Sequence, residues 1–331
     1  MSNDLVFEPS WWLRGPHLQT IWGVLTRSRR MVPYVRERVE TPDGDELILD
    51  HLPGPPDSPY VLVMHGLEGS SYSVYIQGLM SLISRRGWRA TVMNFRYCAR
   101  DPRNVRRAIP NRTKRLYHSG ETTDFHFVLQ RTIAQNPEVP IIAVGVSLGG
   151  NVLLKYLGEQ GSDAPIRAAA ALSVPFDLAG GARHLESPVG RIYSERFLRT
   201  LRRKALDVAR RFPEVEEVMD LSAARSARSI WSFDDACTAP LHGFDDAADY
   251  YARSSSLNFV DKVAVPTLCL SSEDDPLVAP GCAVAARSRA SSAVEVQMTS
   301  SGGHVGFVSG LPWSCRYWAE EYCIQWMEKR L

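Results

Sequence analysis

The residues best suited to chemistry in this sequence are a serine, an aspartate and a histidine that follow one another in that order along the chain. Ser147 stands in the run Gly-Val-Ser-Leu-Gly at 145–149, between an apolar stretch and a helix-like pattern. In that context a GxSxG run is typical of a nucleophile elbow, a sharp turn that presents the serine hydroxyl. The glycines leave room for the strand and the helix to approach each other. We therefore predict that Ser147 is a nucleophile; a serine in a tight turn without chemistry is the alternative.

A serine hydroxyl is a poor nucleophile at neutral pH, so it needs a base, and the base needs a carboxylate that orients it. His304 follows the last predicted strand in Gly-Gly-His at 302–304, and Asp275 follows the strand before it. This is the Ser, Asp, His order of an α/β-hydrolase. We assign His304 as the base and Asp275 as its partner, because Asp-Pro leads out of the loop. Asp274 competes for the acidic role, and Glu273 is a weaker third candidate.

We predict that two backbone N–H groups stabilise the oxyanion of a tetrahedral intermediate. One belongs to Leu67 in the run His-Gly-Leu-Glu-Gly-Ser at 65–70, and the other to Leu148, directly after the serine. Backbone donors suit this task because they are aimed before the reaction begins. His65 precedes the glycine of this loop, and we expect it to form structural hydrogen bonds rather than to act as a base.

Composition and motifs exclude several other classes of function. Lys and Arg (38) balance Asp and Glu (37), which argues against a nucleic-acid partner. The sequence contains no GxGxxG, GxxxxGK[ST] or HExxH motif, so we expect neither a nucleotide cofactor nor a metal. The N-terminal residues lack the pattern of a signal peptide, and no apolar stretch is long enough for a transmembrane anchor. Six scattered cysteines favour reduced thiols and a cytoplasmic location.

The elements around these residues alternate between strand and helix, which predicts a mostly parallel sheet flanked by helices. A hairpin is expected over Val35–Leu52, around Thr-Pro-Asp-Gly. The predicted strands are Tyr60–Met64, Ala90–Phe95, Ile141–Val146, Ala168–Val174, Thr267–Ser271 and Ala293–Met298. The predicted helices are Val74–Arg85, Glu121–Gln135, Leu148–Glu159, Gly281–Arg289 and a closing helix over Trp313–Lys329.

Between the predicted strands Ala168–Val174 and Thr267–Ser271 the sequence shows no strand pattern and reads as helical. We interpret 1–331 as a single domain in which residues 176–255 form a helical lid over the site. The alternative, two domains split near Pro175, would leave the last two strands with too few partners. Residues 183–211 contain nine basic and three acidic side chains. This basic segment could contact a lipid surface, although a solvated helix face explains it more simply.

The sequence resembles the YheT-like branch of the α/β-hydrolases, bacterial relatives of the animal ABHD-type esterases and lipases. The resemblance runs almost end to end. It rests on Trp-Leu-Arg-Gly-Pro-His-Leu-Gln-Thr-Ile at 12–21, the run at 65–70, Asn-Phe-Arg at 94–96, Tyr-His-Ser-Gly-Glu-Thr at 117–122, the run at 145–151, Phe-Asp-Asp at 233–235, Gly-Phe at 243–244 and Asp-Tyr-Tyr at 249–251. Where the family usually has Gly-Cys after Asn-Phe-Arg, this chain has Tyr97-Cys98, which predicts an altered pocket rim.

The resemblance implies a carboxylic-ester hydrolase that acts on short- to medium-chain acyl esters or acylglycerols, with the triad carried onto Ser147, Asp275 and His304. The membrane anchor of the animal relatives is not carried over. An acyltransferase shares the first half-reaction and is the nearest alternative. A non-catalytic protein that retains the fold is an alternative from another class. The partner we expect is a small-molecule ester; the sequence does not indicate an oligomeric state.

Overall fold

One eight-stranded sheet organises the protein, with the strand order β1-β2-β4-β3-β7-β8-β9-β10. The structure is a computed structural model that describes residues 6–27 and 32–331. Strands β1 and β2 pair in antiparallel fashion, β2 is antiparallel to β4, and the pairs from β4 to β10 are parallel. The strands are β1 (Val35–Glu40), β2 (Glu46–Leu52), β3 (Tyr60–Met64), β4 (Arg89–Asn94), β7 (Ile141–Val146), β8 (Ala168–Leu172), β9 (Thr267–Ser272) and β10 (Val294–Thr299). The mostly parallel sheet predicted from the sequence is confirmed.

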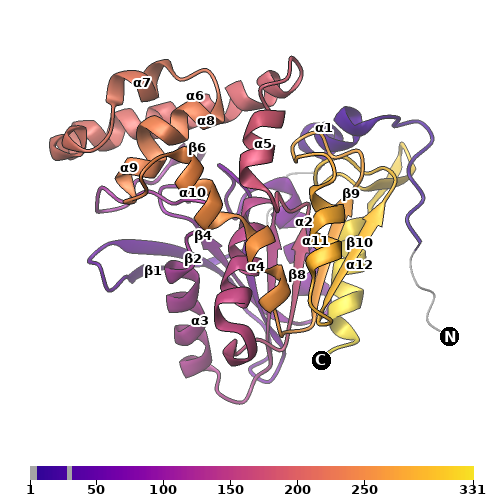
Figure 1. The fold of residues 1–331 in the computed structure, drawn as a ribbon. Coiled ribbons are helices and arrows are strands. Elements are labelled where there is room, and N and C mark those ends of the chain that lie inside the picture. Colours follow the sequence, from indigo (N-terminus) through magenta and orange to yellow (C-terminus); the bar gives the residue numbers. More distant parts are fainter. Residues whose placement is uncertain (1–5, 28–31) are drawn as a thin grey trace.

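Helices cover both faces of this sheet, as Figure 1 shows. Every residue of β7 and β8 is buried, which explains why both strands are continuous apolar runs rather than alternating ones. One face packs against α3 (Thr123–Gln135), α4 (Leu148–Gln160) and α11 (Cys282–Arg289). The other face packs against α2 (Val74–Arg85) and α12 (Trp318–Glu328). Ser147 therefore lies where the central strand β7 meets a helix that is buried against the sheet.

The chain between β8 and β9 is helical and lies above the carboxyl edge of the sheet (Figure 1). Its helices are α5 (Leu178–His184), α6 (Gly190–Arg211), α7 (Leu221–Ser226), α8 (Ile230–Phe233), α9 (Ala239–Leu241) and α10 (Ala247–Ser254), with short 3-10 and π turns between them. Helix α6 buries Leu198 and Val208 in an apolar cluster that is separate from the two clusters on the faces of the sheet. Its Arg196 and Arg199 are exposed. Among residues 6–27 and 32–331, no helix is long and apolar enough to cross a membrane.

The sequence-based prediction places the start of the last helix five residues too early, at Trp313 rather than at Trp318. Trp313 is 81% exposed in the turn of a hairpin between β11 (Val308–Leu311) and β12 (Ser314–Tyr317), and the helix starts only at Trp318. The hairpin turns at Pro312 and Trp313, and Gly310 within β11 adopts φ +83°, a left-handed conformation that glycine tolerates. Sequence reasoning also missed helix α1 (Pro16–Thr26) and the hairpin of β5 (Arg100–Asp101) with β6 (Asn104–Ala108).

Candidate active site

Ser147 occupies a strained turn between β7 and α4. Its backbone has φ 55° and ψ −120°, which a non-glycine residue rarely adopts. The flanking glycines are required by close packing rather than by their own dihedral angles. A Cβ on Gly145 would lie 2.3 Å from the Gly149 carbonyl oxygen, and one on Gly149 would lie 2.7 Å from the Met64 carbonyl oxygen. The GxSxG spacing thus lets a helix start directly against the sheet, with the serine at its tip.

The structure brings the three predicted side chains together. His304 Nε2 lies 2.9 Å from Ser147 Oγ, and His304 Nδ1 lies 2.8 Å from Asp275 Oδ2. The Asp275 side chain is 1% exposed and the His304 side chain 11% exposed. A buried carboxylate behind the imidazole favours the tautomer that carries its proton on Nδ1 and leaves Nε2 free to accept the serine proton.

The neighbouring acids lie elsewhere. Asp274 Oδ1 accepts a hydrogen bond from the Gly303 N–H at 2.9 Å, so this carboxylate supports the loop that carries His304. Glu273 is exposed. Asp275 also accepts from the Leu277 N–H at 2.9 Å, which fixes the orientation of its carboxylate. Of the three acids proposed from the sequence, only Asp275 contacts the imidazole.

The loop after β3 lies directly beside the serine. A Cβ on Gly66 would lie 3.1 Å from the Ser147 Cβ atom, and the Gly66 N–H donates to the Tyr75 hydroxyl at 2.9 Å. Leu67 and Leu148 line the same cavity as Ser147. Neither of their N–H groups donates to any described group, so both are available to a ligand. Unused backbone donors beside a nucleophile are groups that could stabilise an oxyanion.

His65 lies close in sequence but does not contact the serine. It is buried, its Nδ1 lies 2.8 Å from the Gly66 carbonyl oxygen, and its Nε2 accepts from the Phe95 N–H at 3.2 Å. Since Nε2 accepts, the ring is neutral with its proton on Nδ1. Burial lowers the pKa of His65 to about 4. The ring therefore connects the ends of β3 and β4, as expected for a structural histidine.

This buried imidazole should make the protein sensitive to acid. The pKa of His65 falls from 6.5 in the unfolded chain to about 4 in the folded one. The unfolded chain therefore binds the extra proton between these pH values, and stability is lost as pH falls through this window. From urea unfolding curves at pH 6.5 and pH 4, we expect the wild type to lose about 3 kcal/mol more than His65→Gln.

His184→Gln is the matched control, because the His184 ring forms no hydrogen bond with any described group. It should keep the full acid sensitivity of the wild type. Parallel stability curves for the wild type and His65→Gln over this pH range would contradict the assignment of a neutral, buried imidazole.

An apolar cavity extends from Ser147 under the α5–α10 helices, with about 850 Å³ of empty space when the open solvent at its mouth is included. Its walls come from the sheet edge and from the insertion, and they include aliphatic side chains of both. Among them are Leu67, Leu148, Leu178, Leu185, Leu201, Ile230 and Val278. Such walls favour a hydrocarbon chain over a polar substrate group.

Helix α1 packs against the loop that carries His304. The Thr20 hydroxyl accepts from the His304 N–H at 2.9 Å, and Gln19 Oε1 accepts from the Val308 N–H at 2.7 Å. Gln19 is 1% exposed and also donates to the Val308 carbonyl oxygen at 3.3 Å. Sequence reasoning missed this support, although both residues lie in the run 12–21 that carries the family resemblance.

A buried ion pair connects helix α6 to the loop of Leu67. Lys204 Nζ lies 2.6 Å from Glu68 Oε1 and 3.2 Å from Cys98 Sγ, and the Tyr117 hydroxyl donates to the same Glu68 oxygen at 2.8 Å. Burial raises the pKa of the Glu68 carboxyl, but the adjacent Lys204 and the hydrogen bond from Tyr117 together outweigh this effect and leave the pKa below its usual value. Glu68 also adopts φ 55°, so this pair holds a strained loop in place.

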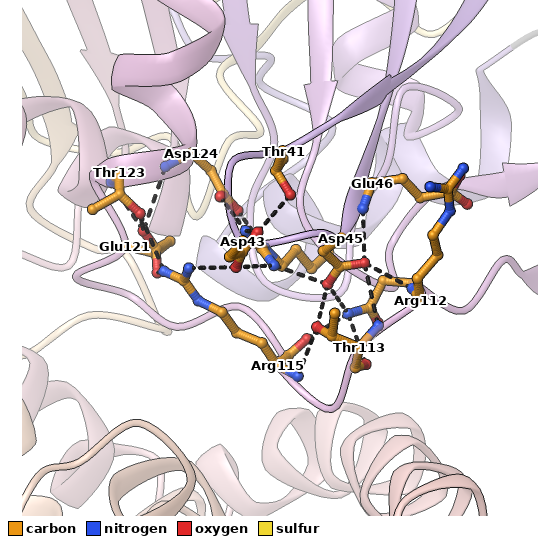
Figure 2. Close-up of polar contacts among 12 residues, drawn as sticks. Thr41, Asp43, Asp45, Glu46, Arg112, Thr113, Arg115, Glu121, Thr123 and Asp124 are labelled. Atoms are coloured by element: carbon orange, nitrogen blue, oxygen red, sulfur yellow. Dashed lines mark hydrogen bonds and ion pairs between the residues drawn. The ribbon is translucent and has the colours of Figure 1, made fainter.

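A second charged network fixes the segments that follow β4 and precede α3. Arg96, with a side chain 1% exposed, donates to Asp43 at 2.9 Å, to Asp45 at 2.8 Å and through two nitrogens to Asp124. Figure 2 shows the carboxylates of the β1–β2 turn gathered beside Asp124 and Arg115. Because each acid has a guanidinium partner, the network is structural and connects the β1–β2 turn to the loop after β4 and to the start of α3. No hydrophobic pattern indicates such a buried charge cluster.

Tyr97 occupies the position where the resembling family usually has glycine. Its φ of +63° explains that preference, and its hydroxyl donates to Asp207 of α6 at 2.5 Å. Tyr97 therefore connects the loop after β4 to the helical insertion, and the altered pocket rim expected at this position stays a prediction.

Comparison with known proteins agrees with this geometry. Residues 59–311 match the family described as "alpha/beta hydrolase fold". YheT of Escherichia coli, named as a candidate esterase, is 36% identical over 330 residues, which cover 98% of this chain and 94% of that protein. The human protein named "Phospholipase ABHD3" is 30% identical over 314 residues, 92% of this chain and 74% of that one. A solved esterase of Pyrococcus furiosus, 16% identical, superposes with a TM-score of 0.57 over 90% of each chain, which shows the shared fold.

Proposed function

Because the chain belongs to the α/β-hydrolase family, in the branch of YheT and the ABHD-type proteins, we propose that it is a serine carboxylesterase that works through an acyl-enzyme. The observation that carries the proposal is the continuous chain of hydrogen bonds from Asp275 through His304 to Ser147. A serine, a base and an orienting acid in mutual contact can activate the hydroxyl for attack on an ester.

The proposed reaction has two halves. His304 Nε2 takes the proton of Ser147 Oγ as the oxygen attacks the ester carbonyl, and the oxyanion accepts hydrogen bonds from the Leu67 and Leu148 N–H groups. His304 then gives the proton to the departing alcohol, which leaves the acyl group on the serine. In the second half, His304 deprotonates a water molecule that attacks the acyl-enzyme and releases the carboxylic acid. Asp275 stabilises the imidazolium in both halves.

The apolar cavity supports a substrate with a short- to medium-length acyl chain, because its aliphatic walls begin at the serine. We also propose that residues 176–255 act as a lid, since they supply one wall of that cavity. A cytoplasmic location is supported by the six cysteines, which are all free thiols and of which five are buried.

The test combines a fluorophosphonate probe with a series of p-nitrophenyl esters of increasing acyl length. The wild type should be labelled, and intact-mass and peptide analysis should place the label on Ser147. Ser147→Ala should resist labelling and lose turnover. A wild type that resists the probe would favour the non-catalytic alternative, and ester products formed on addition of alcohols in place of free acid would favour the acyltransferase.

A further inference from the structure

The wall that the helical insertion supplies to the apolar cavity contains a carboxyl group. Asp234 begins the π turn of residues 234–238, which follows α8, and it lines the cavity together with Thr238 and Tyr251. Among the described residues that line this cavity, Asp234 is the only Asp or Glu. Turns of the π type are frequent at functional sites. An ester bound at Ser147 therefore shares the space of its acyl chain with this carboxyl group.

The Asp234 carboxylate is buried and contacts two neutral hydroxyl groups. The residue is 8% exposed, its Oδ1 accepts from the Thr238 hydroxyl at 2.6 Å, and its Oδ2 accepts from the Tyr251 hydroxyl at 2.7 Å. Within the described part of the chain, neither oxygen accepts from a backbone N–H group or from a cationic side chain. Each carboxylate oxygen has two lone pairs, so each can accept from one more donor.

The other buried acids of the protein have basic partners. Over residues 6–27 and 32–331, eight Asp and Glu residues are buried, and all except Asp234 lie within ion-pair distance of an Arg or a His: Asp45, Glu46, Asp50, Glu121, Asp124, Asp275 and Glu320. An unpaired carboxylate is costly to bury. Burial raises the pKa of Asp234 to about 6, so the group is still ionised at neutral pH. Perturbed acids in a cavity are candidates for functional groups.

We propose that Asp234 is a specificity-determining residue that accepts a hydrogen bond from a hydroxyl group on the acyl chain, so that hydroxyacyl esters are favoured over plain acyl esters. This inference rests on the proposed esterase function and names the class of acyl group. The aliphatic walls contact the hydrocarbon part, and the chain hydroxyl supplies the donor that the buried carboxylate lacks. A chain that carries its own carboxylate is disfavoured, because two negative charges would meet in an apolar space.

The first test compares methyl octanoate with the methyl esters of 3-hydroxy-, 6-hydroxy- and 8-hydroxyoctanoic acid, all below their aggregation limits. The wild type should favour at least one hydroxy ester in kcat/KM by about tenfold, since a hydrogen bond to an ionised group is stronger than one between neutral groups. In Asp234→Leu this preference should disappear. The esters are compared on one protein, so partial unfolding cancels from the ratio. A wild type that favours no hydroxy ester would overturn the proposal.

The second test reads the charge of Asp234 directly, with the monomethyl ester of octanedioic acid. Asp234→Asn keeps the size of the side chain and removes its charge, so kcat/KM for this ester relative to methyl octanoate should rise about tenfold. Asp235→Asn is the matched control: Asp235 is exposed, does not line the cavity, and as Asn can still accept from the Ala247 N–H at 3.0 Å. It should keep the wild-type ratio. An unchanged ratio in Asp234→Asn would show that Asp234 has only a structural role.

Calorimetric binding of the same four octanoate esters to Ser147→Ala separates this proposal from the esterase function. That protein should bind at least one hydroxy ester more tightly than methyl octanoate, and the added Asp234→Leu change should remove the difference. Selective binding without turnover of any ester by the wild type would reject the esterase and keep the hydroxyl site. Turnover of all four esters with equal kcat/KM and equal affinity would reject the hydroxyl site and keep the esterase.

Discussion

Asp275→Asn should lower kcat/KM for a p-nitrophenyl ester by about 10³ to 10⁴-fold, because an amide in place of the buried carboxylate no longer favours the tautomer that accepts the serine proton. The carboxylate lies 2.8 Å from His304 Nδ1 and is almost completely buried, so neither water nor another described acid can replace it. Steady-state kinetics at neutral pH, with circular dichroism to verify folding, measure this effect.

The adjacent acids provide matched controls for that experiment. Asp274→Asn keeps a side-chain oxygen that can accept from the Gly303 N–H, so its effect should stay within about tenfold. Glu273→Gln alters an exposed side chain and should leave the rate unchanged. If Asp274→Asn were as damaging as Asp275→Asn, the orientation of the imidazole would depend on the loop rather than on one carboxylate.

Lys204→Met should destabilise the protein by about 3 to 5 kcal/mol, because it leaves the Glu68 carboxylate buried without a cation. Lys204 is 5% exposed and holds Glu68 at 2.6 Å, next to the Leu67 N–H group. The free energy of unfolding from urea titration gives the loss. Ester turnover below the melting temperature should fall as well, since the strained loop at Glu68 loses its ion pair with α6.

The double variant Lys204→Met, Glu68→Gln should recover much of this stability, because no charge remains buried. Lys262→Met is the surface control: Lys262 is exposed, its side chain pairs with no described group, and the change should alter stability by less than about 0.5 kcal/mol. A loss below about 1 kcal/mol in Lys204→Met would show that the ion pair does not restrain the loop.

The sequence predicts the site better than it predicts what surrounds it. Ser147 is recognisable because its signal is local: an apolar run, a GxSxG turn and a helix pattern lie within a few residues. Asp275 and His304 follow from chain order, since successive parallel strands end at one edge of a sheet. Thr20 has no comparable local signal, because its partner is 284 residues away in the chain.

The errors in predicting the fold also arise from contacts between residues that are distant in the chain. The apolar residues Trp313 and Cys315 continue the pattern of the last helix. The chain turns at 312–313, however, and the Val308 N–H is held by Gln19, so a hairpin forms there instead. The buried Arg96 contradicts the general rule that charged side chains are solvated. It is stable because the carboxylates of Asp43, Asp45 and Asp124 contact it. These residues are far apart in the chain, so no sequence pattern indicates that they meet.

The contact between α1 and the His304 loop also bears on the order of events during synthesis. The residues that support the imidazole leave the ribosome long before the imidazole itself, since these contacts span 284 to 289 residues. Contacts between such distant segments form late in folding. A nascent chain therefore contains Ser147 well before this residue can attack a substrate, and reactivity starts only when these two distant segments of the polypeptide meet.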